Sequence, residues 1–190
     1  MTDKLTPQQR HNCMSRIKGK DTKPEILVRR WLWKEGWRYR LHVKGFPGKP
    51  DIVIRKIKTV IFVHGCFWHG HNVQTAGTSE GACGVTELTN SDCCKIPLSN
   101  REFWLTKITN NRLRDYRNYA VYRQAEWRVL VVWECMLKPK KREATLQALS
   151  YKLNALFLDS VRKPKNYETE EHDHCAAAAE PNPQYGHGGY

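Results

Sequence analysis

The strongest constraint on how this chain folds lies at residues 59–71, where an apolar run passes directly into a cluster of histidines. The run Thr59–Val63 consists of β-branched and aromatic residues, a composition that indicates a buried strand. The eight residues that follow, His-Gly-Cys-Phe-Trp-His-Gly-His, hold three imidazoles, one thiol and two adjacent aromatic rings. So many nitrogen and sulfur groups directly after a rigid strand predict a functional site at the end of that strand.

The histidines and the cysteine of this cluster suit two kinds of chemistry. Cys66 and His71 have a spacing that suits two ligands of one metal ion. His64 and His69 remain available to transfer protons near neutral pH. Because flat aromatic rings stand beside both sets, the cluster points toward chemistry on a nucleic acid.

Positive charge is concentrated in the N-terminal third of the chain. The whole sequence of 190 residues has a net charge of +13, and residues 1–60 hold 16 Lys and Arg against 5 Asp and Glu. Residues 61–190 hold 16 against 14. Such a basic surface favours binding to a phosphate backbone, since each neutralised phosphate releases counterions. The alternative is a basic, solvent-exposed surface with no partner.

Length and composition indicate one ordinary cytosolic domain. No run approaches the roughly 18 apolar residues that span a bilayer, and the polar N-terminus lacks the apolar segment of a signal peptide. Thiols stay reduced in the cytosol, and an odd count of seven Cys argues against a complete disulfide framework. We therefore expect some cysteines to bind metal, no membrane association, and a monomer, because no coiled-coil pattern is present.

Hydrophobic periodicity and capping signals predict a mixed α/β domain with a central sheet. Helices are expected at residues 7–18, 24–35, 100–125 and 143–158, and strands at 38–43, 51–54, 59–63 and 128–133. The second and third strands are expected to form a hairpin. Thr22 is the expected N-cap of the second helix, and Glu25 completes a capping box.

Composition divides the chain into three parts. Residues 1–20 form a basic helical arm, residues 21–158 the main domain, and residues 159–190 a polar tail that we expect to be disordered. Within the main domain, residues 72–94 are rich in Gly, Thr, Ser and Asn, which predicts a long surface loop.

Asp51 is a candidate ligand for a hard metal ion. It follows Pro50 at the start of a predicted strand, so its carboxylate stands on a rigid element. Carboxylate oxygens suit Mg²⁺, which can stabilise the attacking and leaving oxygens of a phosphodiester displacement. The alternative is a turn-terminating Asp that makes a local hydrogen bond to the backbone.

Four motifs, taken in order, resemble the very-short-patch repair (Vsr) DNA mismatch endonucleases. They are Gly48–Asp51, Val63–His71, Arg101–Trp104 and Trp127–Cys135, and Val63 lies twelve positions after Asp51. The resemblance covers about residues 8–158 and implies a restriction-endonuclease-like fold, a central mixed sheet flanked by helices. It also implies a Mg²⁺-dependent enzyme that nicks one DNA strand 5′ of the T in a T·G mismatch left by deamination of 5-methylcytosine.

The resemblance assigns a role to each candidate catalytic residue. Asp51 is the implied Mg²⁺ ligand, His69 helps to activate the attacking water, and His64 lies near the reacting phosphate or the leaving group. Glu25 is the implied helix-borne acid near His69, a role that is compatible with its capping box. For the two histidines the alternative is structural zinc ligation or a hydrogen bond in the core. Val63 stands where the family usually has Thr. If the role of this residue is to offer its backbone carbonyl to Mg²⁺, Val is sufficient; if the Thr hydroxyl matters, activity is reduced.

A structural zinc site of the Cys₃His type is also implied, and three of its ligands are in place: Cys66, His71 and Cys135. Val73 stands where a third cysteine is common in the family. We infer that Cys93 or Cys94 supplies that ligand, with Cys83 as a weaker candidate. The alternative is that this protein has lost zinc.

The resemblance further implies that three aromatic residues, Phe67, Trp68 and Trp104, wedge into the duplex beside the mismatch. For Trp104 the alternative is an ordinary place in a helix core. Met14 is implied to enter from the minor groove, and Arg16 and Lys18 to hold phosphates. The implied partners are double-stranded DNA with a T·G mismatch and other mismatch-repair proteins.

Two rival functions stay open. The first is a restriction-type or other structure-specific nuclease of the same fold, which would have the same catalytic residues and differ only in substrate. The second is a zinc-stabilised DNA-binding module without catalysis. The presence of Asp51, His64 and His69 together argues against the second.

Overall fold

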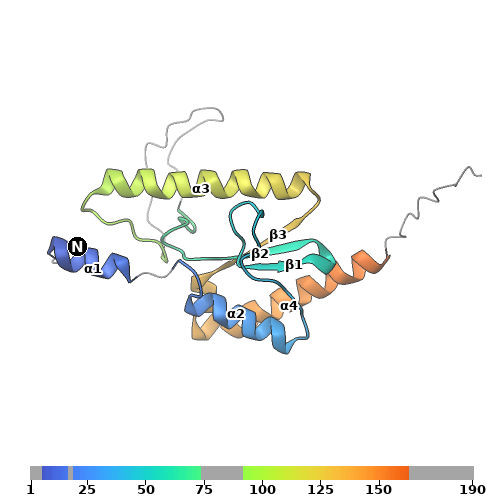
Figure 1. Cartoon of the computed structure of the whole chain (residues 1–190). Coiled ribbons are helices and arrows are strands. Elements are labelled where there is room, and N and C mark those ends of the chain that lie inside the picture. The colour runs from blue at the N-terminus through green and yellow to red at the C-terminus, as the bar shows by residue number, and fades with distance from the viewer. Residues whose placement is uncertain (1–5, 17–18, 74–91, 163–190) are drawn as a thin grey trace, which may run out of the picture.

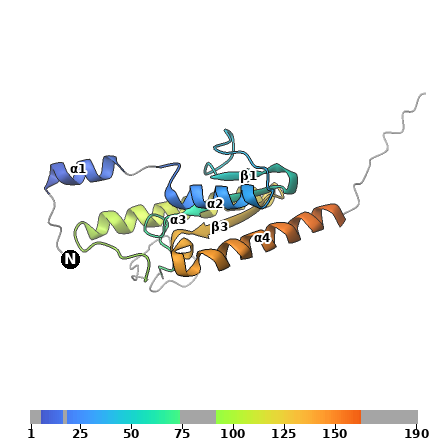
Figure 2. The ribbon, with the colours of Figure 1, turned by 90° about the horizontal axis from the view of Figure 1, so that it is seen from below.

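The computed structural model describes residues 6–16, 19–73 and 92–162, and it has a mixed α/β architecture (Figure 1). A three-stranded sheet in the order β1-β2-β3 forms its centre. Helix α3 lies on one side of this sheet, and helices α2 and α4 lie on the other (Figures 1 and 2). In this part of the chain, no helix is long and apolar enough to cross a bilayer.

The sheet is mixed because its central strand has one antiparallel and one parallel neighbour. Strand β2 (Thr59–His64) pairs antiparallel with β1 (Ile52–Ile54) and parallel with β3 (Arg128–Trp133). A 3-10 turn, η1 (Arg55–Ile57), joins β1 to β2. The predicted hairpin and last strand are therefore confirmed.

The prediction of a strand at residues 38–43 is wrong. Only one bridge forms there, between Arg40 and Val53. His42 and Gly45 both adopt positive φ, 47° and 82°, so the chain turns away from the sheet after Arg40 and pairs no further.

All four predicted helices are present, with different ends for some. They are α1 (Pro7–Ser15), α2 (Lys23–Lys34), α3 (Arg101–Gln124) and α4 (Pro139–Arg162), and a 3-10 turn, η2 (Glu134–Leu137), precedes α4. Helix α4 extends beyond the predicted range 143–158 at both ends, because Pro139 suits a first helical turn and residues 159–162 continue the helix. Those four residues are therefore helical and do not belong to the predicted tail. The remaining tail residues, 163–190, and loop residues 74–91 lie outside the described residues.

The start of α2 differs in detail from a capping box. Thr22 is the N-cap, and its hydroxyl oxygen accepts the Glu25 backbone N–H at 3.5 Å. The Thr22 hydroxyl in turn donates to Glu25 Oε1 at 2.8 Å. Glu25 Oε2 accepts the backbone N–H of Asp21, one residue earlier than the box predicts, at 2.9 Å.

Alternating side chains of β2 build a core on each face of the sheet. Toward α2 and α4, Ile61 joins a large buried cluster: Val28, Leu32, Ile52, Ile54, Ile57, Leu130, Val132, Leu137, Leu146, Leu149 and Leu153. Toward α3, Val60 and Phe62 pack with Val53 and Tyr122. Because β-strand side chains alternate, His64 falls on the α3 face and Val63 on the other.

Core packing predicts a position-dependent effect of shortening leucines on α4. Leu153 is fully buried, whereas Leu158 on the same helix is 53% exposed. Leu153→Ala should lower the free energy of unfolding by about 2–5 kcal/mol through lost burial and a residual cavity. Leu158→Ala should change it by no more than about 0.5 kcal/mol. Urea unfolding measures both, and equal losses in the two variants would contradict this account of the core.

Candidate active site and metal centre

A cavity of about 580 Å³ brings together the acid–base residues that the sequence singled out. The segment before β1, the end of β2, the start of α2 and the middle of α3 all contribute to its lining. Glu25, Asp51, His64 and His69 line it, together with Val63 and Trp68. Lys107, Asn111 and Arg114 of α3 complete the wall and add positive charge. The cavity thus combines carboxylates, imidazoles and cations, which suits chemistry on a phosphate group.

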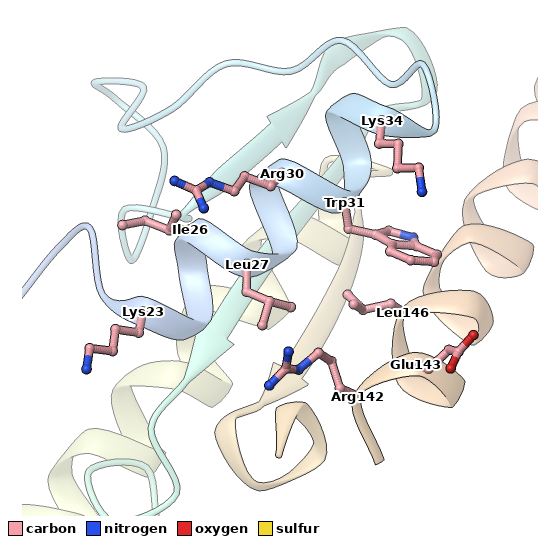
Figure 3. A pocket seen from close by; sticks show the side chains of 9 residues that line it. All are labelled: Lys23, Ile26, Leu27, Arg30, Trp31, Lys34, Arg142, Glu143 and Leu146. Atoms are coloured by element: carbon pink, nitrogen blue, oxygen red, sulfur yellow. The ribbon is translucent and has the colours of Figure 1, made fainter. Parts of the chain in front are cut away.

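A second groove, of about 690 Å³, lies between α2 and α4 (Figure 3). Leu27, Trp31 and Leu146 form its apolar part, and basic side chains such as Arg30 and Arg142 surround them. Its lining contains no histidine and one carboxylate, that of Glu143. The groove therefore lacks the groups for acid–base chemistry, and the smaller cavity is the candidate active site.

Asp51 is held at the start of β1 by a hydrogen bond from the neighbouring strand. Its Oδ2 accepts the backbone N–H of Val63 at 2.7 Å, a contact twelve residues away in sequence rather than the local bond of a turn. Burial raises the pKa of Asp51 to about 6. The hydrogen bond from Val63 lowers this pKa, and the charge of Glu25 raises it further. At neutral pH the carboxylate is thus ionised in surroundings that disfavour its charge, which favours binding of a cation.

His64 and His69 stack face to face in the cavity wall. Their ring centroids are 3.6 Å apart and their planes differ by 11°. Burial lowers the pKa of His64 to about 3, and the charge of His69 contributes to the same shift. His64 is therefore neutral at physiological pH, and its Nε2 lies 2.6 Å from the Tyr119 hydroxyl.

Asp115 of α3 orients His69, a partnership that the sequence reasoning missed. The distance between Asp115 Oδ2 and His69 Nδ1 is 2.5 Å. A carboxylate at Nδ1 fixes an imidazole so that its other nitrogen is available as a base. The available signal was helical spacing, since Ile108, Asp115, Tyr119 and Tyr122 follow one another on one face of α3.

His64, His69 and Asp115 also lie close enough together to suggest a metal site, with candidate ligand atoms within 4.8 Å of one another. The stacking argues against it. An ion must lie near the plane of each imidazole that binds it, and no ion can do so for two stacked rings whose planes differ by 11° and whose centroids are 3.6 Å apart. We interpret this group as a hydrogen-bonded acid–base relay.

Glu25 is buried and fully engaged at the start of α2. Besides its bonds to Thr22 and Asp21, its Oε2 accepts from Arg29 Nη2 at 2.8 Å. Arg29 also pairs with Asp21, at 2.5 Å. The helix-capping role is therefore present in the structure, at a position that also borders the candidate active site.

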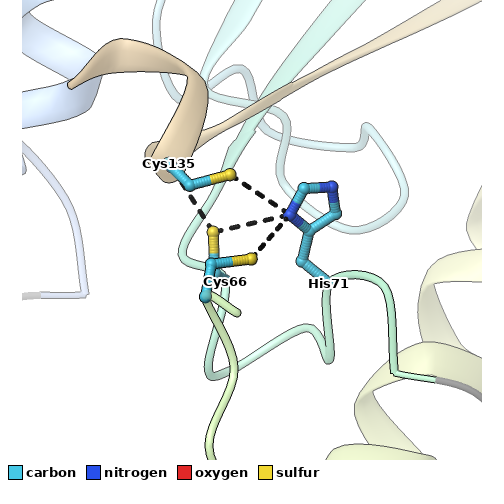
Figure 4. Close-up of side chains that lie close together, drawn as sticks. Cys66, His71 and Cys135 are labelled. Atoms are coloured by element: carbon cyan, nitrogen blue, oxygen red, sulfur yellow. Dashed lines mark hydrogen bonds between the residues drawn. The ribbon is translucent and has the colours of Figure 1, made fainter. Parts of the chain in front are cut away.

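A second cluster, of thiols and one imidazole, lies beyond the ends of β2 and β3 (Figure 4). Its members are Cys66, His71, Cys93 and Cys135, and their candidate ligand atoms all lie within 4.8 Å of one another. His71 Nδ1 is 3.7, 3.1 and 3.3 Å from the sulfurs of Cys66, Cys93 and Cys135. Burial raises the pKa of Cys66 to about 12, and the neighbouring thiols oppose its ionisation. One cation at the centre would stabilise all the thiolates, so this Cys/His cluster is a candidate metal site.

Cys93 and Cys94 have different surroundings although they are adjacent. Cys93 joins the Cys/His cluster, whereas Cys94 is fully buried with Val73, Ile96 and Ile108, and its thiol approaches the Phe67 carbonyl at 3.8 Å. Val73 thus faces an apolar core rather than the metal candidate. Cys83 lies outside the described residues.

The predicted wedge residues form one aromatic group next to the candidate active site. Phe67, Trp68 and Trp104 pack edge to face, with ring centroids 5.1–6.1 Å apart. Phe67 and Trp104 also pack on the apolar cluster around Cys94, so the core role considered for Trp104 is partly realised. Phe103, which contacts Trp104, is 58% exposed.

Two of the predicted DNA-binding residues of the N-terminal arm, Met14 and Arg16, belong to α1 or its C-cap. Met14 is 43% exposed on α1, and Arg16 is the exposed C-cap of that helix. Helix α1 stands away from the sheet (Figure 2). Lys18 lies outside the described residues.

The amino-acid sequence is similar to that of known DNA endonucleases. Residues 2–75 match the family model described as DNA mismatch endonuclease Vsr. The type II nicking enzyme V.NmeAIP of Neisseria meningitidis is 44% identical over 140 residues, which cover 74% of this chain and 87% of that protein. The type II nicking enzyme V.XorIIP of Xanthomonas oryzae is 42% identical over 137 residues, 72% of this chain and 88% of that protein. The DNA mismatch endonuclease Vsr of Escherichia coli is 34% identical over 153 residues, 80% of this chain and 86% of that protein.

The raised pKa of Asp51 predicts that its charge destabilises the metal-free fold. A group whose pKa rises on folding contributes stability below its unfolded value, here 3.8, and loses it as the pH rises through its folded value, about 6. Asp51→Asn keeps an oxygen for the Val63 N–H and never ionises. At pH 8 in metal-free buffer the variant should be more stable by about 1–3 kcal/mol, since partial exposure of the carboxylate reduces the full effect.

Urea unfolding at several pH values tests this expectation. The advantage of Asp51→Asn should shrink as the pH falls from 7 to 4, where the wild-type carboxyl takes up its proton. An advantage of the same size at pH 8 and pH 4 would contradict the assignment to charge.

Proposed function

Because the chain belongs to the Vsr family of DNA mismatch endonucleases, we propose that it nicks the T-containing strand of a T·G mismatch 5′ of the T. The cavity that Asp51 shares with His64 and His69 carries this proposal. We also propose a restriction-endonuclease-like fold for the mixed α/β structure, because a small mixed sheet flanked by helices bears the site.

The donor set of the cavity fits Mg²⁺. Asp51 uses one carboxylate oxygen for the Val63 N–H, and among the described residues its other oxygen accepts no hydrogen bond. That oxygen and the backbone carbonyl of Val63 would hold the ion, a role for which Val serves as well as Thr. Bound Mg²⁺ supplies positive charge that stabilises the phosphate as it is attacked.

Acid–base work falls to the histidines. With Asp115 at its Nδ1, His69 accepts a proton from the attacking water at Nε2. Neutral His64 lies next to it, where the reacting phosphate or the leaving group would be. Glu25 fixes the start of α2 beside Asp51 and is the helix-borne acid of the site. Lys107 and Arg114 attract the phosphate to the cavity they line.

Mismatch recognition is assigned to the aromatic group. Phe67, Trp68 and Trp104 would enter the duplex beside the T·G pair, which is more easily opened than a matched pair. Such insertion costs a few kcal/mol of unstacking. The basic arm, with Met14, Arg16 and Lys18, would approach the minor groove and hold phosphates rather than read sequence.

The Cys/His cluster is proposed to hold a structural Zn²⁺. Its distances from His71 Nδ1 to three sulfurs, 3.1–3.7 Å, suit tetrahedral coordination by three thiolates and one imidazole. Zinc there would fasten the chain after β2 to the chain after β3. We further propose that the protein acts as a monomer and that mismatch-repair proteins recruit it.

Strand cleavage tests the substrate directly. End-labelled duplexes that differ in a single T·G, T·A or C·G pair should show, with Mg²⁺, a nick only in the T-containing strand of the T·G duplex. Asp51→Ala should reduce this nicking at least about a hundredfold while DNA binding persists.

Cutting of matched duplexes, or of both strands, would instead favour a restriction-type nuclease of the same fold. Binding of the T·G duplex without any cutting would favour a binding module and overturn the proposed catalysis.

Zinc content separates the two adjacent cysteines. Cys93→Ser should lose most of the bound zinc and lower the melting temperature, because it removes one of the four ligands. Cys94→Ser should keep one zinc per chain, since its sulfur faces the Phe67 carbonyl. Cys13→Ser, at an exposed thiol on α1, is the control. Elemental analysis measures the zinc content of each variant. One zinc per chain in Cys93→Ser would show that Cys93 is not a ligand.

A further inference from the structure

Tyr119 of α3 makes a direct contact with His64. Its hydroxyl lies 2.6 Å from His64 Nε2, a short distance for a hydrogen bond between a hydroxyl and a nitrogen. The ring of Tyr119 packs on Phe62, 5.5 Å between centroids, so the buried face of the sheet holds the phenol in place. Phe62 and His64 are two residues apart on β2, so their side chains lie on the same face of the strand. The strand thus positions both side chains that Tyr119 contacts.

The chemistry of the two groups gives the direction of the hydrogen bond. A neutral imidazole has one nitrogen that donates and one that accepts. A phenolic hydroxyl keeps its proton at neutral pH, and burial raises the pKa of Tyr119 further. Among the described residues, His64 Nε2 is the hydrogen-bond partner of that hydroxyl. The Tyr119 O–H therefore donates, and Nε2 accepts.

Asp115 does not compete for this nitrogen. Its Oδ2 lies 3.9 Å from His64 Nε2, beyond hydrogen-bond distance, and is already bonded to His69 Nδ1 at 2.5 Å. A proton on His64 Nε2 would thus form no hydrogen bond with this carboxylate. The hydroxyl would then accept that N–H, and its own proton would have no partner among the described residues.

We propose that Tyr119 is a positioning residue that holds His64 in the tautomer protonated at Nδ1, so that this imidazole serves the reaction as a hydrogen-bond donor. The proposal rests on the proposed nicking function. With Nε2 occupied, the Nδ1 N–H is the donor that His64 retains, and His64 borders the same cavity as Asp51. The two stacked imidazoles then have different tasks. His69, oriented by Asp115, accepts a proton, and His64, oriented by Tyr119, donates a hydrogen bond to a phosphate oxygen.

Histidine ¹⁵N spectroscopy of the zinc-loaded protein without DNA tests the tautomer. Long-range ¹H–¹⁵N correlations should show His64 Nδ1 protonated and Nε2 unprotonated in the wild type. In Tyr119→Phe, which keeps the ring and removes the hydroxyl, the fraction protonated at Nε2 should rise. A wild-type His64 protonated at Nε2, or an identical tautomer in the two proteins, would overturn the proposal.

Kinetics test the consequence. Single-turnover nicking of the T·G duplex should slow about three- to tenfold in Tyr119→Phe, the effect of one hydrogen bond, while affinity for the duplex is unchanged. Tyr116→Phe is the matched control, because Tyr116 lies on the same helix and is 58% exposed, and the hydroxyl bonded to His64 Nε2 is that of Tyr119. If Tyr119→Phe nicks at the wild-type rate, or if both variants are slowed equally, the proposed role of Tyr119 is contradicted.

The spectra and the kinetics together separate failure of the role proposed for Tyr119 from failure of the proposed nicking function. If the wild-type protein does not nick the T·G duplex, the proposed function fails, and the spectra still decide whether Tyr119 sets the tautomer. If the wild type nicks and the spectra show no tautomer change, only the role of Tyr119 fails.

Discussion

The hydrogen bonding of β2 on both of its edges is the constraint on which the rest of the structure depends. Its antiparallel pairing with β1 brings the Val63 N–H to Asp51. Its alternation sends His64 to the α3 face, where Asp115 and Tyr119 lie. A slip of one residue in this register would exchange the two faces of the strand, so one register fixes both halves of the candidate active site.

The parallel pairing of β2 with β3 builds the Cys/His cluster. His64 pairs with Trp133, so Cys66 and Cys135, each two residues further on, emerge side by side. The Cys135 N–H donates to the Cys66 sulfur at 3.4 Å, and the His71 ring stacks on Trp133 with 4.1 Å between centroids. His64 ends β2, and Cys66, His69 and His71 follow in the short segment after it, so the two sites share one stretch of chain. A ligand bound at the thiols would stiffen the segment that holds His69.

The buried carboxylates of the candidate active site each have a defined hydrogen-bond partner. Glu25 pairs with Arg29, and Asp51 accepts one backbone N–H. Burial shifts the pKa of Asp51 upward and that of His64 downward, so each is pushed toward its neutral form. Opposed shifts of neighbouring groups are typical of sites that divide acid, base and ion-binding tasks among side chains.

The sequence alone determined the local elements: the β1–β2 hairpin, the long helix α3, the Thr22 cap, and the run of ligands after Val63. These follow from short-range rules of hydrophobic periodicity and capping. Tertiary structure decided which distant groups meet. Asp115 and Tyr119 reach the histidines only because α3 packs across the sheet, and Cys93 rather than Cys94 joins the Cys/His cluster only because Cys94 turns into an apolar core. Such contacts depend on packing between segments far apart in the chain, which no local pattern encodes.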